Sequence, residues 1–190
     1  MIEATSRDKE LIVDILSASF QENKSVNYLI PQDSKHRHRL RKLIDYSFEI
    51  CMQSGKAVLS DDRKACALLI LPERKKTTLK TLFLMIDLIW NSIGVGNIRK
   101  ALDRENRIGA LHPHTPFYHL WFIGVRPDQQ GKGSGGKLLN EILLEAGELN
   151  RPVYLETSTL RNLPWYEKYG FKIYDKLELT YTLYLLKWTK

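Results

Sequence analysis

The segment QQGKGSGG at residues 129–136 combines four glycines with polar side chains, a composition typical of a loop that binds phosphate. Glycine has no β-carbon, so its backbone can approach an anion closely, and the free amides at the start of a helix attract negative charge. Gly131, Gly133 and Gly136 fit the dinucleotide-binding pattern G-x-G-x-x-G. Gly131, Gly136 and Lys137 fit most of the P-loop pattern G-x-x-x-x-G-K-[ST].

The residues around the loop weigh against both of these interpretations. A P-loop needs a hydroxyl after its lysine to bind Mg²⁺, and here Leu138 takes that position. The dinucleotide interpretation gains support from Glu156, which stands 20 residues after Gly136, where a ribose-binding acid belongs. However, RPDQQ separates the preceding strand from the glycines, and only 54 residues follow Gly136, too few for the rest of a doubly wound sheet.

A third pattern, Q/R-x-x-G-x-G/A, fits Gln130, Gly133 and Gly135 and describes a loop that holds a pyrophosphate. It requires a strand, a turn and glycines that open a helix, which together aim several backbone amides at one anion. Pro127 lies where the turn is expected, and the Gln130 side chain can brace the loop by hydrogen bonding. We therefore favour pyrophosphate binding.

Patterns of apolar residues predict the elements that position this loop. Residues 117–125, FYHLWFIGV, are rich in aromatic and β-branched residues and predict a strand. One helical stripe follows the loop: Leu138, Leu139, Ile142, Leu143, Ala146 and Leu149. After it we expect a strand in PVYLETS, a short helix around Trp165, and two final strands at about 171–175 and 177–188.

The N-terminal half predicts two helices followed by a hairpin. Thr5 and Asp8 form a capping-box pattern before a helix that reaches Phe20, and a second helix is expected from about 33 to 52. GKAVLS and ACALLIL, within residues 55–71, read as a β-hairpin. Two cysteines lie in apolar segments without metal-ligand spacing, so we expect buried, reduced thiols.

Residues 77–107 predict two helical pieces divided at Gly94 and Gly96. They contain the longest apolar run, residues 82–90, which is far shorter than the roughly 20 residues that span a bilayer. We expect this run to pack onto the rest of the domain and expect no membrane partner; a helix lying on a membrane surface is the alternative. The N-terminus has no signal-peptide pattern, so we expect a cytoplasmic protein.

Two separate motifs at a consistent distance carry a family resemblance. GVRPDQQGKGSGGKLL at 124–139 and LETSTLRNLPWYEKYGF at 155–171 resemble the GNAT superfamily of acetyl-CoA-dependent N-acetyltransferases. The second motif looks most like the puromycin N-acetyltransferase-like branch. The resemblance implies one α/β domain over 1–190 with a mixed sheet, the GNAT acyl-CoA N-acyltransferase fold, and an extra helical insertion before the fourth strand. Residues 1–110 would form the acceptor-side half and 117–188 the acetyl-CoA-binding half.

The resemblance also implies which residues hold acetyl-CoA, the expected cosubstrate, and it implies no metal. Main-chain groups of the strand before the loop would line the pantetheine arm, and the loop amides would bind the pyrophosphate. The implied cofactor-binding residues are Ile123, Gly124, Val125, Gln130, Gly131, Lys132, Gly133, Ser134, Gly135, Gly136, Asn162 and Tyr166. Asn162 has a second interpretation, as the N-cap of the short helix.

Acetyl transfer needs a base for the amine and an acid for the departing thiolate. Tyr166 matches the family tyrosine that commonly protonates the thiolate, with packing on the sheet as the alternative. An alkyl amine with a pKa near 10.4 is only about one part in 10³ neutral at pH 7, so a base is useful. His119, expected to share a strand face with Trp121 and Ile123, and Glu156 are the two candidate bases.

The net charge of +7 suits a polyanionic ligand, and coenzyme A is one. No nucleic-acid motif accompanies the basic segment KHRHRLRK at 35–42, so no nucleic-acid partner is expected. We expect an N-acetyltransferase that acts on a primary amine of a small molecule, as a monomer or homodimer. Acetylation of a protein amine, at an N-terminus or a lysine, and non-catalytic acyl-CoA binding are the alternatives. Either 35–42 or 77–90 could line the acceptor site, and the sequence does not identify the acceptor.

Overall fold

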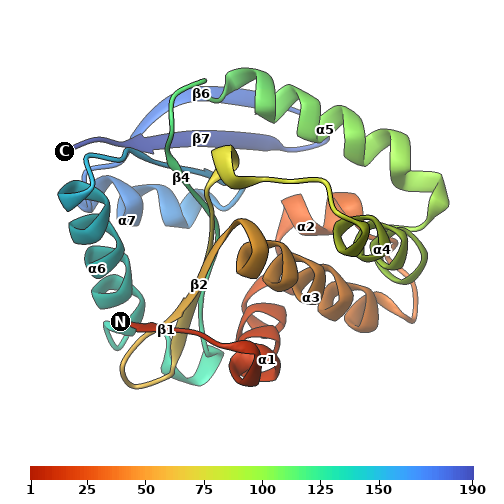
Figure 1. Cartoon of the computed structure of the whole chain (residues 1–190), viewed down its shortest axis with the longest axis horizontal. Coiled ribbons are helices and arrows are strands. Elements are labelled where there is room, and N and C mark those ends of the chain that lie inside the picture. The colour runs from red at the N-terminus through yellow and green to blue at the C-terminus, as the bar shows by residue number, and fades with distance from the viewer.

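A computed structural model describes all residues, 1–190, and shows a seven-stranded sheet (Figure 1). The strand order is β1-β2-β3-β4-β5-β7-β6, and only β4 and β5 run parallel. The strands are β1 (Ile2–Glu3), β2 (Gly55–Leu59), β3 (Ala65–Ile70), β4 (Tyr118–Val125), β5 (Val153–Thr157), β6 (Lys172–Glu178) and β7 (Thr182–Trp188).

Helices cover both faces of the sheet. They are α1 (Lys9–Phe20), α2 (Lys24–Leu29), α3 (His36–Ser54), α4 (Leu79–Leu88), α5 (Ile98–Leu111), α6 (Ser134–Glu148) and α7 (Leu163–Lys168). A core with Leu16, Phe48 and Leu68 packs α1 and α3 on one face, whereas a core with Leu139 and Phe171 packs α6 on the other. The apolar side of α5 forms a small third cluster with β6 and β7.

The structure confirms most of the expected elements. The hairpin, the strand (118–125), the break at Gly94 and the α6 stripe up to Ala146 are present, whereas Leu149 lies beyond α6 and is exposed; Thr5 and Asp8 form the capping box. Two elements lack a strong sequence signal: the two-residue strand β1 and the six-residue helix α2. Both cysteines are free and buried, and burial raises the pKa of their thiols.

The predicted boundary between the last two strands is wrong. The strand β6 continues to Glu178, and the turn lies at Leu179–Tyr181, where the Leu179 amide donates to the Tyr181 carbonyl at 2.9 Å. The alternating apolar pattern runs through this turn because Leu179 and Tyr181 also pack on the cluster beneath α5. Alternation alone therefore hid the hairpin.

A β-bulge in β4 overturns the expected face of one residue. Leu69 pairs with Leu120 and Leu68 with Phe122, which leaves Trp121 as an extra residue in the strand. The bulge reverses the alternation. His119 and Trp121 face the α1 and α3 side, whereas Ile123 packs on the α6 side, so these three residues do not share one face.

The apolar run 82–90 packs on the domain with only one side, so that expectation is partly wrong. Leu84, Leu88 and Ile89 contact the core, but Phe83 and Trp90 are 69% and 68% exposed. No single helix is long and apolar enough to cross a bilayer. The segments Leu79–Ile93 and Val95–Leu111 meet that test together, but they are bent by 101°.

Gly55 lies in the hairpin where the backbone of the neighbouring strand leaves no space for a side chain. A β-carbon there would lie 2.0 Å from the backbone oxygen of Leu69, whereas one at Gly109 in α5 would meet nothing within 4 Å. We predict that Gly55→Ala lowers the free energy of unfolding by about 2–3 kcal/mol. Gly109→Ala is the matched control and should raise it by about 0.5–1 kcal/mol. Urea denaturation measures both, and equal effects would contradict the prediction.

Candidate active site

The strands β4 and β5 part soon after they meet. They pair only at Tyr118 with Val153 and at His119 with Tyr154, although β4 continues to Val125 and β5 to Thr157. On its other edge β4 remains paired with β3 as far as Val125. The second half of β4 thus has one edge without a strand partner, and this edge borders a cleft.

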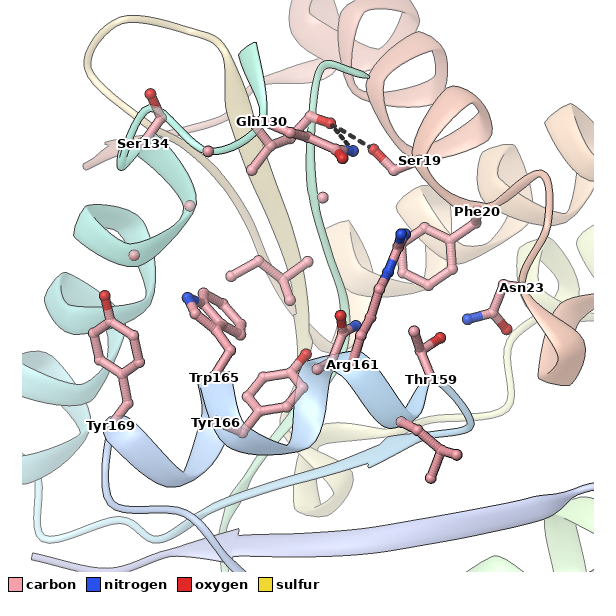
Figure 2. Close-up of a pocket in the computed structure, with 18 of the residues that line it drawn as sticks. Ser19, Phe20, Asn23, Gln130, Ser134, Thr159, Arg161, Trp165, Tyr166 and Tyr169 are labelled. Carbon is pink, nitrogen blue, oxygen red and sulfur yellow. Dashed lines mark hydrogen bonds between the residues drawn. The ribbon is translucent and has the colours of Figure 1, made fainter. Parts of the chain in front are cut away.

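The cleft has a volume of about 950 Å³ and is open to solvent. One wall contains Ile123, Gly124 and Val125, and the glycine loop closes one end. Three aromatic side chains from α7 (Trp165 and Tyr166) and from the residue after this helix (Tyr169) point into the cleft (Figure 2). Phe20 and Asn23, from the end of α1 and the connection to α2, border it on the opposite side.

The glycine loop presents backbone amides to the cleft. Gly131 and Gly133 have φ angles of 77° and 93°, a left-handed conformation that side chains disfavour. The helix α6 begins at Ser134, and its first intrahelical bond runs from the Lys137 amide to the Gly133 carbonyl at 2.9 Å. The preceding amides therefore have no intrahelical acceptor, and the helix dipole adds positive potential at the same place.

Two further glycines are required by close packing. A β-carbon at Gly135 would lie 2.8 Å from Val125, and one at Gly136 would lie 2.1 Å from the Tyr169 hydroxyl. Gly124 serves the opposite face, because a β-carbon there would lie 2.8 Å from Leu16 of α1. The lack of a β-carbon at Gly135 and Gly124 thus allows α6 and α1 to lie close to the second half of β4.

Hydrogen bonds fix the loop and the strand end. The Val125 carbonyl accepts from Ser19 Oγ at 2.8 Å and from Gln130 Nε2 at 3.4 Å (Figure 2). Ser134 Oγ donates to Asp62 at 2.8 Å, and the hydroxyls of Ser60 and Ser134 help to lower the pKa of Asp62 to about 2. Gln130 thus braces the loop as the sequence suggested.

Lys132 and Asn162 occupy different surroundings, although both were predicted to bind the cofactor. Lys132 does not line the cleft, and its Nζ donates to the Asp128 carbonyl at 3.1 Å. Asn162 lines the cleft and stands at the N-cap position of α7, but its side chain makes no capping hydrogen bond. Asn162 is therefore the N-cap residue of α7 by position, but its side chain does not cap the helix.

Tyr166 is 6% exposed, and its hydroxyl points into the cleft (Figure 2). Its ring packs against Trp165 and Phe171 at centroid distances of 4.8 and 5.5 Å. Burial raises the pKa of Tyr166, and the negative charge of Glu156 raises it further. The hydroxyl is therefore protonated at neutral pH and available as a proton donor.

A second cavity of about 80 Å³ adjoins the cleft, and both are lined by Phe20, Asn23 and Ser158. His119 and Glu156 contribute to its wall together with apolar side chains from α2, α3, α5 and β4. Neither 35–42 nor 77–90 lines either cavity.

Glu156 lies between two histidines on this side of the sheet. Its Oε1 is 2.7 Å from His112 Nε2, and its Oε2 is 2.7 Å from His119 Nε2. Burial alone would raise the pKa of Glu156, but the electrostatic interaction with His119 and the hydrogen bonds that both histidines donate hold it well below its usual range. The carboxylate is therefore ionised at neutral pH in a nearly dry site.

The three side chains are also of the types that bind Zn²⁺, and their ligand atoms lie within 4.8 Å of one another. Each histidine nitrogen is, however, at hydrogen-bonding distance from a separate oxygen of Glu156. We therefore interpret His112, Glu156 and His119 as a hydrogen-bonded triad, with Nδ1 of His119 left to accept a proton.

A buried arginine completes the second cavity. Arg104 of α5 is 9% exposed and donates to Ser25 Oγ at 2.7 Å and to the Tyr181 hydroxyl at 3.3 Å. Burial alone would lower its pKa, but Glu105 and Tyr181 keep the pKa of Arg104 above its usual value. The guanidinium therefore places a fixed positive charge on the cavity wall.

The structure thus brings most of the predicted residues together around two adjoining cavities. Sequence reasoning missed several others that line or shape them: Ser19, Phe20, Asn23, Arg104, Trp165 and Tyr169. From sequence, His112 was expected only in a loop beside the acceptor, and its bond to Glu156 was missed. Asn23 caps α2 by accepting from the Val26 amide at 3.0 Å, a local N-cap signal that could have located this helix.

The sequence model of the GNAT acetyltransferase domain matches residues 92–173. This range contains α5, β4, the glycine loop, α6, β5 and α7, which supply much of the lining of both cavities. The part of the chain that contains the glycine loop is therefore similar to a GNAT acetyltransferase domain.

One curated relative is the uncharacterised N-acetyltransferase C550.08 of Schizosaccharomyces pombe, 38% identical over 110 residues. The match covers 48% of this chain and 44% of that protein, so the chain spans less than half of the length of the relative.

Solved structures show the same fold over nearly the whole chain. A protein from Corynebacterium glutamicum, described as histone acetyltransferase HPA2 and related acetyltransferase, has a TM-score of 0.69 at 20% identity, covering 98% of this chain and 93% of that one. Arylalkylamine N-acetyltransferase 2 from Aedes aegypti has a TM-score of 0.63 at 15% identity, covering 98% of this chain and 96% of that one. Arabidopsis thaliana Naa50, solved with the bisubstrate analogue CoA-Ac-MVNAL, has a TM-score of 0.52 at 13% identity, covering 98% of this chain and 95% of that one.

The lowered pKa of Glu156 predicts a pH-dependent contribution to stability. This contribution is fully present above the ordinary carboxyl pKa of about 4.3 and is lost as the pH falls toward the lower folded value. We predict that Glu156→Gln lowers the free energy of unfolding by about 2–3 kcal/mol at neutral pH. Urea denaturation from neutral pH into the acid range should show the difference from wild type shrinking below about pH 4.

Glu148→Gln, at an exposed position on α6, is the control and should unfold like wild type at every pH. A difference between Glu156→Gln and wild type that stays constant across the pH range would contradict the ionised triad.

Proposed function

We propose that this protein is an acetyl-CoA-dependent N-acetyltransferase that acts on a primary amine of a small molecule. The proposal rests on the two cavities meeting at Phe20, Asn23 and Ser158, which line both of them. A thioester in the larger cavity and an amine in the smaller one would meet there. Holding the two reactants in one place supplies much of the rate enhancement in group transfer.

The larger cavity has the groups that coenzyme A requires. The pyrophosphate would bind the free amides between Gly131 and Gly136, supported by the dipole of α6. The pantetheine arm would run along the unpaired edge of β4 at Ile123–Val125 and hydrogen-bond to the main chain, as an added strand would. A main-chain amide of this edge would stabilise the oxyanion that forms on the thioester carbon.

The triad would deprotonate the amine. An alkyl ammonium ion at neutral pH must lose a proton before it can attack, and His119 and Glu156 both border the smaller cavity. Because His119 Nε2 is bonded to Glu156, its Nδ1 would accept the proton, and the anionic carboxylate would stabilise the resulting imidazolium. His112, on the other carboxylate oxygen, would keep Glu156 ionised and fixed in orientation.

Tyr166 would supply the proton that the departing thiolate needs. The amine attacks the thioester carbonyl, the tetrahedral intermediate collapses, and the carbon–sulfur bond breaks. Burial raises the pKa of the Tyr166 hydroxyl, and the same dry surroundings would raise the pKa of the thiol formed beside it. Because both pKa values would rise together, proton transfer from the phenol to the thiolate would remain energetically feasible.

The size of the smaller cavity favours a small acceptor over a peptide. With about 80 Å³, it is much smaller than the cleft of about 950 Å³. Phe20, Trp121 and Phe122 would pack on an apolar or aromatic substituent. The likeness of the second motif to the puromycin N-acetyltransferase-like branch and the fold shared with an arylalkylamine N-acetyltransferase support this class. A protein amine is the second candidate, because the Naa50 complex contains a peptide portion.

Acetyl-CoA should stabilise the folded protein against heat. At a hundredfold excess over Kd, binding contributes about 2.7 kcal/mol, which for a chain of this size raises the Tm by about 5–10 °C. Thermal melting with acetyl-CoA, Mg-ATP and NAD in parallel is the measurement. A rise with ATP or NAD and none with acetyl-CoA would remove the proposed function.

Tyr166→Phe should lower kcat by about 10²-fold and leave the Kd for acetyl-CoA unchanged, because only the proton donor is lost. The assay is thiol release with a panel of small amines, aromatic amines included, and with short peptides for comparison. Turnover of peptides alone would favour the protein-amine alternative. Acetyl-CoA binding without turnover of any amine would favour a non-catalytic module.

A further inference from the structure

The helix α4 exposes a continuous apolar surface that neither cavity uses. Leu79, Phe83 and Trp90 are 77%, 69% and 68% exposed, and they recur at helical spacing. Leu82, Met85 and Ile86 lie on the same exposed part of the helix and are 44–49% exposed. We call these six residues the α4 apolar face.

The opposite side of α4 is also apolar, but it is covered. Leu84, Leu88 and Ile89 pack on the core formed with α3. A helix that is apolar on both sides needs cover on both, and an exposed patch of large apolar side chains marks an interaction surface. The α4 apolar face thus lacks a partner within the chain.

Exposed basic residues lie at the start of α4. Arg74, Lys75 and Lys76 precede the helix, are exposed and make no ion pair with any carboxylate of the protein, whereas Lys80 in its first turn pairs with Glu49 at 2.8 Å. Asp87 is the one acidic residue between 77 and 98, and it is already bonded to Lys42 at 3.3 Å. The surroundings of the α4 apolar face therefore carry an excess of positive charge.

The helix α4 also lies far from the cofactor side of the protein. It is at the opposite end of the longest molecular axis from α6, which follows the glycine loop (Figure 1). A partner on the α4 apolar face would leave the cleft open to coenzyme A and solvent. The surface is thus suited to docking and not to acceptor binding.

We propose that α4 docks this protein on an anionic lipid bilayer. The α4 apolar face would enter the boundary between headgroups and acyl chains, and Arg74, Lys75 and Lys76 would pair with lipid phosphates. A second copy of the chain fits less well, because an α4–α4 contact brings no free carboxylate to these cations. This surface binding replaces the expectation from sequence that no membrane partner exists.

The test is co-sedimentation of the full-length protein with vesicles of phosphatidylcholine and phosphatidylglycerol, compared with phosphatidylcholine alone. Wild type should bind the anionic vesicles, more weakly as the salt concentration rises. The double substitution F83S/W90S should lower the partition coefficient by at least about tenfold. K75E/K76E should abolish the preference for anionic vesicles.

Matched controls separate the surface from general effects. L144S/L149S removes two equally exposed apolar side chains, 61% and 55% exposed, near the other end of the protein and should bind like wild type. K172E/K187E makes the same charge change at two exposed lysines of β6 and β7 and should keep the anionic preference. Trp90→Phe should bind but lose most of the tryptophan quenching by brominated lipids.

Absence of wild-type binding to anionic vesicles would overturn the proposal, as would binding that F83S/W90S leaves intact. Sedimentation velocity without lipid tests whether a second copy of the chain covers the α4 apolar face instead. A dimer that F83S/W90S dissociates, with no vesicle binding, would assign the α4 apolar face to self-association. Acetyl-CoA melting and amine turnover of F83S/W90S should match wild type, so failure here is distinct from failure of the proposed function.

Discussion

The early separation of β4 from β5 is the constraint on which the site depends. A parallel pair normally continues its hydrogen bonds along the shorter strand, but here the pairing ends at His119 and Tyr154. The separation leaves main-chain groups of β4 without strand partners, and buried groups of this kind are costly unless something else pairs with them. It also opens a path through the sheet, so that Tyr166 on one face and Glu156 on the other border adjoining cavities.

The surrounding structure keeps the two strands apart and well defined. On the side of α1, Gly124 allows a close approach, and Ser19 binds the Val125 carbonyl. On the side of α6, Gly135 allows the helix to contact the same strand end. The bulge at Trp121 changes which residues point to each face just where the strands diverge. Each device acts on the second half of β4, where the proposed cofactor arm would lie.

Much of the fold could be predicted because its elements carry strong local patterns. The stripe of α6, the hairpin of β2 and β3, and the glycine loop depend on residues close together in sequence. The bulge at Trp121 depends on pairing with a strand some fifty residues earlier, so alternation within β4 could not reveal it. The two-residue strand β1 exists only because β2 offers it an edge.

The site was predictable in part for the same reason. The loop glycines and Tyr166 belong to local motifs, so sequence alone could place them together. The triad joins residues from three separate elements, and only the fold brings His112 to Glu156. Exposure of Phe83 and Trp90 was hidden as well, because an apolar helix gives the same pattern whether one side or both sides are covered.

On the proposed function, coenzyme A binds the glycine loop and the unpaired edge of β4. Amide hydrogen exchange with and without acetyl-CoA, followed by mass spectrometry, tests it most directly. We predict slower exchange in peptides that contain residues 122–125 and 131–136, and no change in those that contain 79–90. Protection confined to other segments, with unchanged exchange in the glycine loop, would contradict it.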